Sequence, residues 1–150
     1  MKKSVTLLAG CMVIVGLAAC SMEQQIELAD GSRTQASHWQ GRWLVINYWA
    51  EWCAPCRHEI PELNDLHEDR VGNALVVLGV NYDGLTQPKI GEVIERMDIR
   101  FPVLKHDPRE QYGYGRPEQL PVTVLISPQR KVHDILVGPQ TAASIRAAML

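Results

Sequence analysis

The stretch that decides the fold is Val45-Ile46-Asn47-Tyr48-Trp49-Ala50-Glu51-Trp52-Cys53-Ala54-Pro55-Cys56. β-Branched and aromatic residues fill positions 43–49, and this composition favours a β-strand. After Cys53, apolar residues recur at roughly helical spacing with charged residues between them, which predicts a helix over 53–70. The chain is therefore expected to pass from a strand into a helix, with two cysteines at the start of that helix.

Cys53 and Cys56, with two residues between them, suit reversible disulfide exchange at the start of a helix. A helix N-terminus presents unpaired N–H groups and a positive electrostatic potential, and both stabilise a thiolate. We therefore expect Cys53 to be the attacking nucleophile and Cys56, one helical turn deeper, to resolve the mixed disulfide. Pro55 would lie in the first turn, where its missing N–H costs little.

Two other roles of the cysteine pair, a metal site and a structural disulfide, find less support. A structural zinc site needs four ligands, yet there is no second CxxC, and the histidines are scattered at positions 38, 58, 67, 106 and 133. A disulfide that closes so short a loop removes little entropy from the unfolded chain. We therefore predict a redox-active disulfide, with no metal and no cofactor.

Outside this stretch, predicted strands and helices alternate, which indicates one α/β domain over residues 26–150. The continuous apolar run from Leu75 to Val80 is typical of a central strand that is covered on both faces. Strands at 122–126 and 132–137 are joined by a short turn, so they are expected to pair antiparallel. The remaining expected elements are a strand over 26–28 and helices over 89–97 and 141–150, the last capped by Thr141.

Composition argues against several classes of protein. The 150 residues are 46% hydrophobic and 21% charged, which argues against a disordered chain, collagen, a long coiled coil and a multi-span membrane protein. The net charge of −2 gives no basic surface for nucleic acid. Four cysteines are too few for a disulfide scaffold. A single globular domain with no nucleic-acid partner is the expectation that follows.

Residues 1–19 have the features of a secretory signal, with two lysines followed by an apolar run. The run ends in Leu17-Ala18-Ala19-Cys20, which resembles the bacterial lipobox. In signals of that kind the peptide is cut before the cysteine, which receives a diacylglyceryl group, so Cys20 is the expected lipidation site. An uncleaved helical anchor and an ordinary secretion signal are the alternatives. Removal of 1–19 would leave 131 residues, with 20–25 as the lipidated N-terminus and short tether.

The cysteine stretch closely resembles the active-site segment of thioredoxins. Its continuation, Cys56-Arg57-His58-Glu59-Ile60-Pro61, resembles the C-R-x-E-x-P pattern of TlpA/ResA-like envelope oxidoreductases. Further similarities are Gly79-Val80-Asn81 with Asp83, Phe101-Pro102-Val103-Leu104, Tyr112-Gly113, and Leu120-Pro121-Val122-Thr123-Val124-Leu125-Ile126. The resemblance spans roughly residues 41–137. It implies a thioredoxin fold, an α/β fold with a central mixed β-sheet flanked by helices, and an inserted segment around residues 83–99.

The same resemblance implies a substrate groove. The Leu120–Pro121 bond would be cis and lie against the cysteines, where Pro121 keeps metals away and the backbone of Leu120 pairs with the substrate. Without the resemblance, Pro121 would be interpreted as an ordinary proline at the start of a strand. Trp52 and Pro55 would also contribute to the groove, Trp52 as a partly exposed wall.

Two polar residues near the cysteines each have two interpretations. Asn47 stands where thioredoxins carry a titratable Asp, a role that an amide cannot fill, so it is expected to be a buried polar group with partners. Glu59 matches a Glu that ResA-like proteins hold near the site. It could accept the proton of Cys56, and its charge would raise the pKa of nearby thiols. Alternatively, Glu59 simply profits from the helix dipole near the N-terminus of the helix.

The resemblance implies an envelope thiol:disulfide oxidoreductase that reduces protein substrates such as apocytochrome c or metalloprotein thiols. A membrane thiol-redox donor would recycle it, and its lipid anchor would lie in the outer membrane, facing the periplasm, if the source is Gram-negative. Two alternatives are a thioredoxin-fold copper-delivery protein, against which the two-residue spacing argues, and a non-catalytic binding module. Peroxidase activity has less support because no Pro-x-x-x-Thr-x-x-Cys arrangement occurs. The direction of electron flow depends on the reduction potential, which the motif does not determine.

Overall fold

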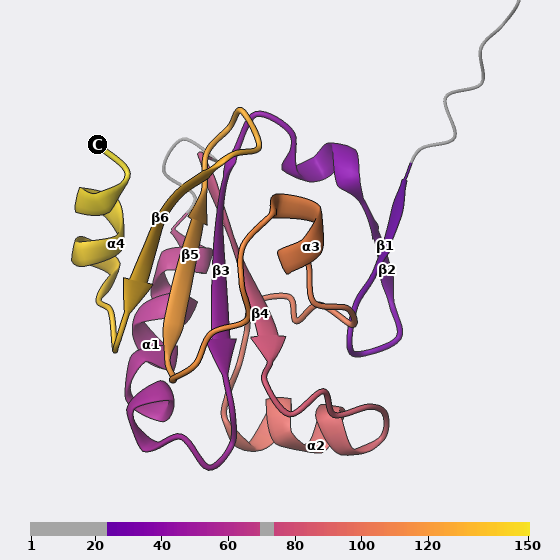
Figure 1. Ribbon diagram of the computed structural model, residues 1–150. Coiled ribbons are helices and arrows are strands. Elements are labelled where there is room, and N and C mark those ends of the chain that lie inside the picture. The colour runs from indigo at the N-terminus through magenta and orange to yellow at the C-terminus, as the bar shows by residue number, and fades with distance from the viewer. Residues whose placement is uncertain (1–23, 70–73) are drawn as a thin grey trace, which may run out of the picture.

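A four-stranded mixed sheet forms the centre of the molecule (Figure 1), a computed structural model that describes residues 24–69 and 74–150. The strands follow the order β4-β3-β5-β6. They are β3 (Trp43–Trp49), β4 (Leu75–Asn81), β5 (Val122–Ile126) and β6 (Val132–Val137). β3 and β4 run parallel, whereas β5 is antiparallel to both β3 and β6. The predicted mixed sheet and the antiparallel pairing of its last two strands are confirmed.

Helices cover one face of this sheet, and a hairpin with short helices covers the other (Figure 1). The helices of the first face are α1 (Ala54–Glu68), α2 (Lys89–Arg96) and α4 (Ala142–Ala148). On the second face lie β1 (Gln25–Glu27), β2 (Arg33–Gln35), the 3₁₀ helix η1 (Ala36–Trp39) and α3 (Arg109–Tyr112). α2 lies within the segment 83–99 that was expected to be inserted.

The alternation of side chains along β3 divides the core into two layers. Leu44, Ile46 and Tyr48 join the cluster under the hairpin and α3, whereas Val45 and Trp49 join the cluster under α1 and α4. A strand repeats every two residues, so the odd positions of β3 all face the helices. Asn47 therefore lies on the helix-facing side of the sheet.

Capping residues fix the ends of the two helices that frame this helix-facing layer. Cys53 is the N-cap of α1, and its sulfur accepts a hydrogen bond from the backbone N–H of Cys56 at 3.2 Å. Thr141 caps α4 as predicted, because its hydroxyl accepts from Ser144 N–H while the Ser144 hydroxyl accepts from Thr141 N–H. Each cap supplies an acceptor to an N–H that the helix itself leaves unpaired.

One expectation about the sheet was wrong. The apolar strand β4 is an edge strand, not a central one. Its residues are buried on both faces, as the apolar run predicted, and its outer edge is covered by chain segment 102–104. There Gly79 N–H donates to the carbonyl of Pro102 at 2.8 Å, and Gly79 carbonyl accepts from Leu104 N–H at 2.8 Å. The apolar run therefore reported burial correctly, but burial is not the same as a central position in the sheet.

Part of the predicted N-terminal organisation lies outside the described residues. This applies to the signal peptide over 1–19, to the lipidation site Cys20 and to most of the tether over 20–25. Within 24–69 and 74–150, no helix is both long enough and apolar enough to cross a bilayer.

Candidate active site

The two cysteines of the CxxC stretch form a disulfide at the N-terminus of α1. β3 ends at Trp49, a short turn follows, and α1 begins at Ala54, so the sulfurs stand at the carboxyl end of a buried strand. Cys53 is 4% exposed, whereas Cys56 is completely buried. Both cysteines are therefore buried, and Cys53 is the slightly more exposed of the two residues. Pro55 is exposed in the first turn of α1, as predicted.

A buried carboxylate lies one helical turn beyond Cys56. Glu59 is only 2% exposed, and residues three apart on a helix are neighbours on its surface. Its Oε1 accepts a hydrogen bond from Asn47 Nδ2 at 2.7 Å, and its Oε2 accepts from the backbone N–H of Gln140 at 2.9 Å. Asn47 Nδ2 also donates to Thr123 Oγ1 at 3.1 Å. Asn47 is therefore a buried polar group with partners, as expected.

Two opposing effects act on the pKa of Glu59. Burial away from water penalises the charged carboxylate and is the larger effect, whereas the hydrogen bonds from Gln140 and Asn47 favour it. The net result raises the pKa of Glu59 to about 7. A carboxyl group with such a pKa can gain or lose a proton near neutral pH, which is a requirement for a proton-transfer group. Its participation in proton transfer stays a prediction.

The two tryptophans that precede the cysteines have different environments. Trp49 is fully buried in the helix-facing core, whereas Trp52 is 64% exposed. The indole N–H of Trp52 donates to both carboxylate oxygens of Asp83, at 3.1 and 3.2 Å. Asp83 lies in the loop that follows β4. The bond therefore connects Trp52, the residue before Cys53, to that loop. Trp52 thus presents an exposed and tethered aromatic face.

The Leu120–Pro121 peptide bond is cis, as the resemblance implied. Pro121 is buried, and its carbonyl accepts from Gly138 N–H at 2.9 Å. Leu120 is half-buried and packs against the same core cluster that contains both cysteines. Leu120 is therefore linked to the cysteines through a shared core, and Pro121 follows it across the cis peptide bond.

Two supports of the site were not predicted from the sequence. The backbone of Gln140, in the loop before α4, donates to Glu59 from 81 positions away. The carboxylate of Glu51 binds Arg96 of α2 at 2.8 and 2.9 Å, and the Glu51 carbonyl accepts from Arg57 Nη1 at 2.7 Å. These bonds hold the turn before the cysteines from both sides. A backbone donor leaves no signature in a sequence, and the charges of Glu51 and Arg96 resemble those of any exposed surface.

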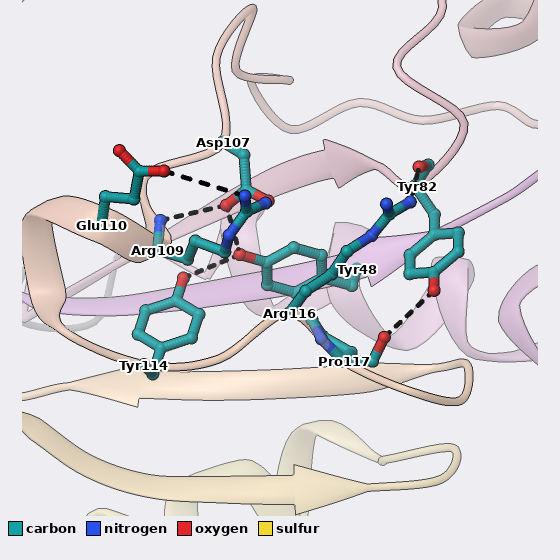
Figure 2. A network of polar contacts seen from close by, with 8 residues as sticks. All are labelled: Tyr48, Tyr82, Asp107, Arg109, Glu110, Tyr114, Arg116 and Pro117. Carbon is teal, nitrogen blue, oxygen red and sulfur yellow. Dashed lines mark hydrogen bonds and ion pairs between the residues drawn. The ribbon is translucent and has the colours of Figure 1, made fainter.

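A further polar network fixes the loops on the other face of the sheet (Figure 2). The Tyr48 hydroxyl donates to Asp107 Oδ1 at 2.6 Å and lies 3.0 Å from the Tyr114 hydroxyl. Arg109 binds Asp107 through its side chain at 2.8 Å and its backbone N–H at 3.0 Å. Burial, together with Asp107, raises the pKa of Tyr48 far above its usual range, so its hydroxyl stays protonated and donates. This network fastens the chain from 107 to 114 to β3.

No group of three or more His, Cys, Asp or Glu side chains that could hold a metal ion occurs within 24–69 and 74–150. The chemical groups that the site contains are a disulfide, a buried carboxyl and an exposed indole. Such a set suits thiol–disulfide exchange coupled to the transfer of one proton.

Comparison with known proteins agrees with this chemistry. ResA, a thiol-disulfide oxidoreductase of Oceanobacillus iheyensis, is 31% identical over 124 residues, which cover 80% of this chain and 62% of that protein. ResA of Geobacillus thermodenitrificans is 30% identical over 123 residues, which cover 78% of this chain and 67% of that protein. The chain thus spans only about two thirds of the length of these relatives.

Solved structures show the same fold. A thioredoxin-family thiol:disulfide interchange protein of Chlorobium tepidum superposes with a TM-score of 0.69 at 22% identity, covering 85% of this chain and 90% of that one. The exposed lipoprotein thioredoxin Etrx1 of Streptococcus pneumoniae gives a TM-score of 0.67 at 21% identity, covering 85% and 97%. Residues 15–135 match the sequence pattern described as the AhpC/TSA family. With that match over most of its length, this chain with a thioredoxin-like fold belongs to the AhpC/TSA family.

Proposed function

We propose that the chain is an envelope thiol:disulfide oxidoreductase that reduces disulfides of protein substrates through Cys53 and Cys56. The observation that carries the proposal is the Cys53–Cys56 disulfide at the N-terminus of α1, where Cys53 is the slightly more exposed of two buried residues. The named activity of relatives at 30–31% identity supports the same assignment.

The reaction conserves atoms and electrons. The Cys53 thiolate attacks one sulfur of a substrate disulfide, and the other substrate sulfur leaves as a thiolate that takes up a proton. Cys56, once deprotonated, attacks the Cys53 sulfur of the mixed disulfide, and the second substrate sulfur leaves. Two electrons pass to the substrate, and the Cys53–Cys56 disulfide of the structure is the product state. The N–H of Cys56 that points at Cys53 Sγ would stabilise the attacking thiolate.

Glu59 is proposed to accept the proton of Cys56. Its raised pKa and its place one turn from Cys56 support this role. Asn47 can serve both states of the acid, because its amide donates to the carboxylate and, rotated by half a turn, offers its oxygen to the protonated acid. In the present arrangement the buried Asn47 Oδ1 has no partner among the described residues.

The proposed substrate groove is formed by Trp52, Pro55, Leu120 and Pro121. Trp52 and Pro55 are exposed beside Cys53, and Leu120 and Pro121 stand directly before β5. An extended substrate segment would pair with the backbone of Leu120 and lie against the indole of Trp52.

The proposed location rests on the N-terminal segment, and the proposed partners rest on the resemblance to ResA-like proteins. The lipobox-like Cys20 would carry the lipid anchor, and the tether that starts there would keep the domain at its membrane. A thiol-redox protein of the membrane would supply electrons by reducing the Cys53–Cys56 disulfide. Apocytochrome c and metalloprotein thiols are the substrate classes we propose. Outer-membrane anchoring, facing the periplasm, is proposed if the source is Gram-negative.

The test measures reduction of insulin disulfides by dithiothreitol with wild type, Cys53→Ser and Cys56→Ala. Wild type should accelerate the reaction, and Cys53→Ser should not. In a separate experiment with envelope extracts, Cys56→Ala should accumulate mixed disulfides through Cys53. The reduction potential of the pair decides the direction of electron flow. Tight Cu(I) binding without reductase turnover would overturn the proposal in favour of copper delivery.

A further inference from the structure

A polar cavity lies beside the proposed substrate groove, at the carboxyl end of β4. Its volume is about 280 Å³. The charged and aromatic side chains that line it include Tyr82, Asp83, Lys105, Asp107, Arg109 and Arg116. Asp83 also binds the indole of Trp52, which neighbours Cys53 in the sequence. A direct hydrogen bond therefore joins Asp83 of the cavity wall to Trp52 of the proposed groove.

Arg116 is the cation of this wall that has no acidic partner. Lys105 is paired with Glu27 at 2.7 Å, and Arg109 is paired with Asp107 at 2.8 Å. Arg116 forms no ion pair with any residue of 24–69 or 74–150, although it is exposed. The two carboxylates of the wall are already engaged, Asp83 by Trp52 and Asp107 by Tyr48 and Arg109. Arg116 is thus the cation of this wall that has no ion pair among the described residues, whereas the neutral indole of Trp52 satisfies Asp83 by hydrogen bonds without offsetting a charge.

The structure holds the Arg116 guanidinium in place (Figure 2). Its carbon lies 4.3 Å from the centre of the Tyr82 ring, and its Nη2 donates to the Tyr82 carbonyl at 3.0 Å. In return, the Tyr82 hydroxyl donates to the carbonyl of Pro117 at 3.1 Å. These two hydrogen bonds and the stacked ring form a clamp between the end of β4 and the chain that leads to Leu120.

A clamped guanidinium is well suited to bind a carboxylate. Only one of its five N–H donors is used by the protein in the described contacts, and its planar fork matches the two oxygens of a carboxylate. Because stacking already restricts the side chain, less rotamer freedom is lost on binding. A second donor on the wall, the buried Asn81 Nδ2, also lacks a hydrogen-bond partner among the described residues.

We propose that this cavity binds a carboxylate of the disulfide substrate, an Asp or Glu side chain close to the target cysteine, through Arg116. The proposal rests on the proposed function, since the ligand is the protein substrate of the Cys53–Cys56 pair. It deepens that function by naming a chemical class: substrates with an acidic residue beside the disulfide. Arg116 would then be a specificity residue for a reaction that the cysteines perform.

The experiment uses two disulfide peptides that differ only in one Glu or Gln beside a cysteine. Binding is measured first, with the Cys53–Cys56 pair and the peptide both oxidised, so that neither of these two cysteines is a thiol that could start exchange. We expect the Glu peptide to bind wild type about fivefold more tightly, which corresponds to ~1 kcal/mol. The preference should disappear in Arg116→Gln and shrink in Arg116→Lys, which keeps the charge but loses the fork. The Arg Nε–H resonance of Arg116 should shift only with the Glu peptide.

Arg130→Gln is the matched control, because Arg130 also stacks on a tyrosine, Tyr112, but does not line this cavity. It should keep the preference for the Glu peptide. Equal binding of the two peptides to wild type, or an unchanged preference in Arg116→Gln, would overturn the proposal.

Turnover is measured second, with both peptides and reduced chain. Failure to reduce either peptide would count against the proposed function, whereas equal reduction of both would count only against the carboxylate site.

Discussion

At the scale of single residues, Glu59 is the group whose protonation is coupled to the fold. Its carboxyl is buried and accepts two hydrogen bonds, yet burial prevails and raises its pKa to about 7 from an ordinary value of 4.5. In the unfolded chain the group loses its proton near pH 4.5, whereas in the folded chain it keeps the proton up to about pH 7. The folded state therefore binds more protons across this interval, and stability must fall as the pH rises through it.

Glu59→Gln should remove this pH dependence. We expect wild type to lose about 2–3 kcal/mol of its free energy of unfolding between pH 4.5 and pH 7 because of Glu59, and the variant to lack that component. Urea unfolding of the oxidised proteins at pH 5 and pH 8 measures it, since disulfide-bonded cysteines do not titrate. Glu95→Gln, at an exposed position of α2, should behave as wild type. An identical pH dependence in wild type and Glu59→Gln would contradict the assignment.

At the scale of elements, β4 can approach the core only because it carries a glycine. A Cβ atom on Gly79 would lie 2.9 Å from Trp49 Nε1, 3.0 Å from Phe101 Cε2 and 3.1 Å from Val103 Cγ2. Gly79→Ala should therefore destabilise the protein by about 1–3 kcal/mol, measured by chemical unfolding. Gly115→Ala is the control, since a Cβ there would meet no atom within 4 Å. Equal stability of the two variants would mean that the side chains around Gly79 can shift to admit a Cβ atom without loss of free energy of unfolding.

The clamp between β4 and the chain before β5 is a second feature at this scale. Tyr82→Phe removes the hydrogen bond to the Pro117 carbonyl but keeps the ring under Arg116. We expect a loss of about 0.5–1.5 kcal/mol and faster hydrogen exchange at the backbone amides of 118–120. Tyr112→Phe is the control, because the Tyr112 hydroxyl makes no hydrogen bond to a described residue. Unchanged exchange at 118–120 in Tyr82→Phe would show that the clamp does not hold this segment.

At the scale of the whole molecule, local patterns predicted what local forces determine. The strand over 43–49, the helix that follows it and the Thr141 cap depend on neighbours in sequence. The order of the strands depends on distant contacts, and it was not predicted. The hairpin partner β2 and the short helix α3 are local elements, but each is only three or four residues long, and they were not predicted either. The same holds at the site, where the cysteines stand in a motif but the Gln140 donor and the Arg116 clamp join segments 81 and 34 positions apart.

The predicted lipid anchor concerns how the whole molecule is placed, and its chemistry depends on one thiol. If Cys20 is acylated, labelled fatty acid should enter wild type and be lost in Cys20→Ser, because the hydroxyl does not form the thioether. Cys11→Ser is the matched control: Cys11 lies within the predicted signal over 1–19, so its loss should leave labelling unchanged. Each buried CH₂ of an acyl chain contributes about 0.8 kcal/mol, so a diacylglyceryl group retains the domain at a bilayer. Mature wild type should begin at Cys20 by mass spectrometry, and fatty-acid labelling of Cys20→Ser would refute the lipobox assignment.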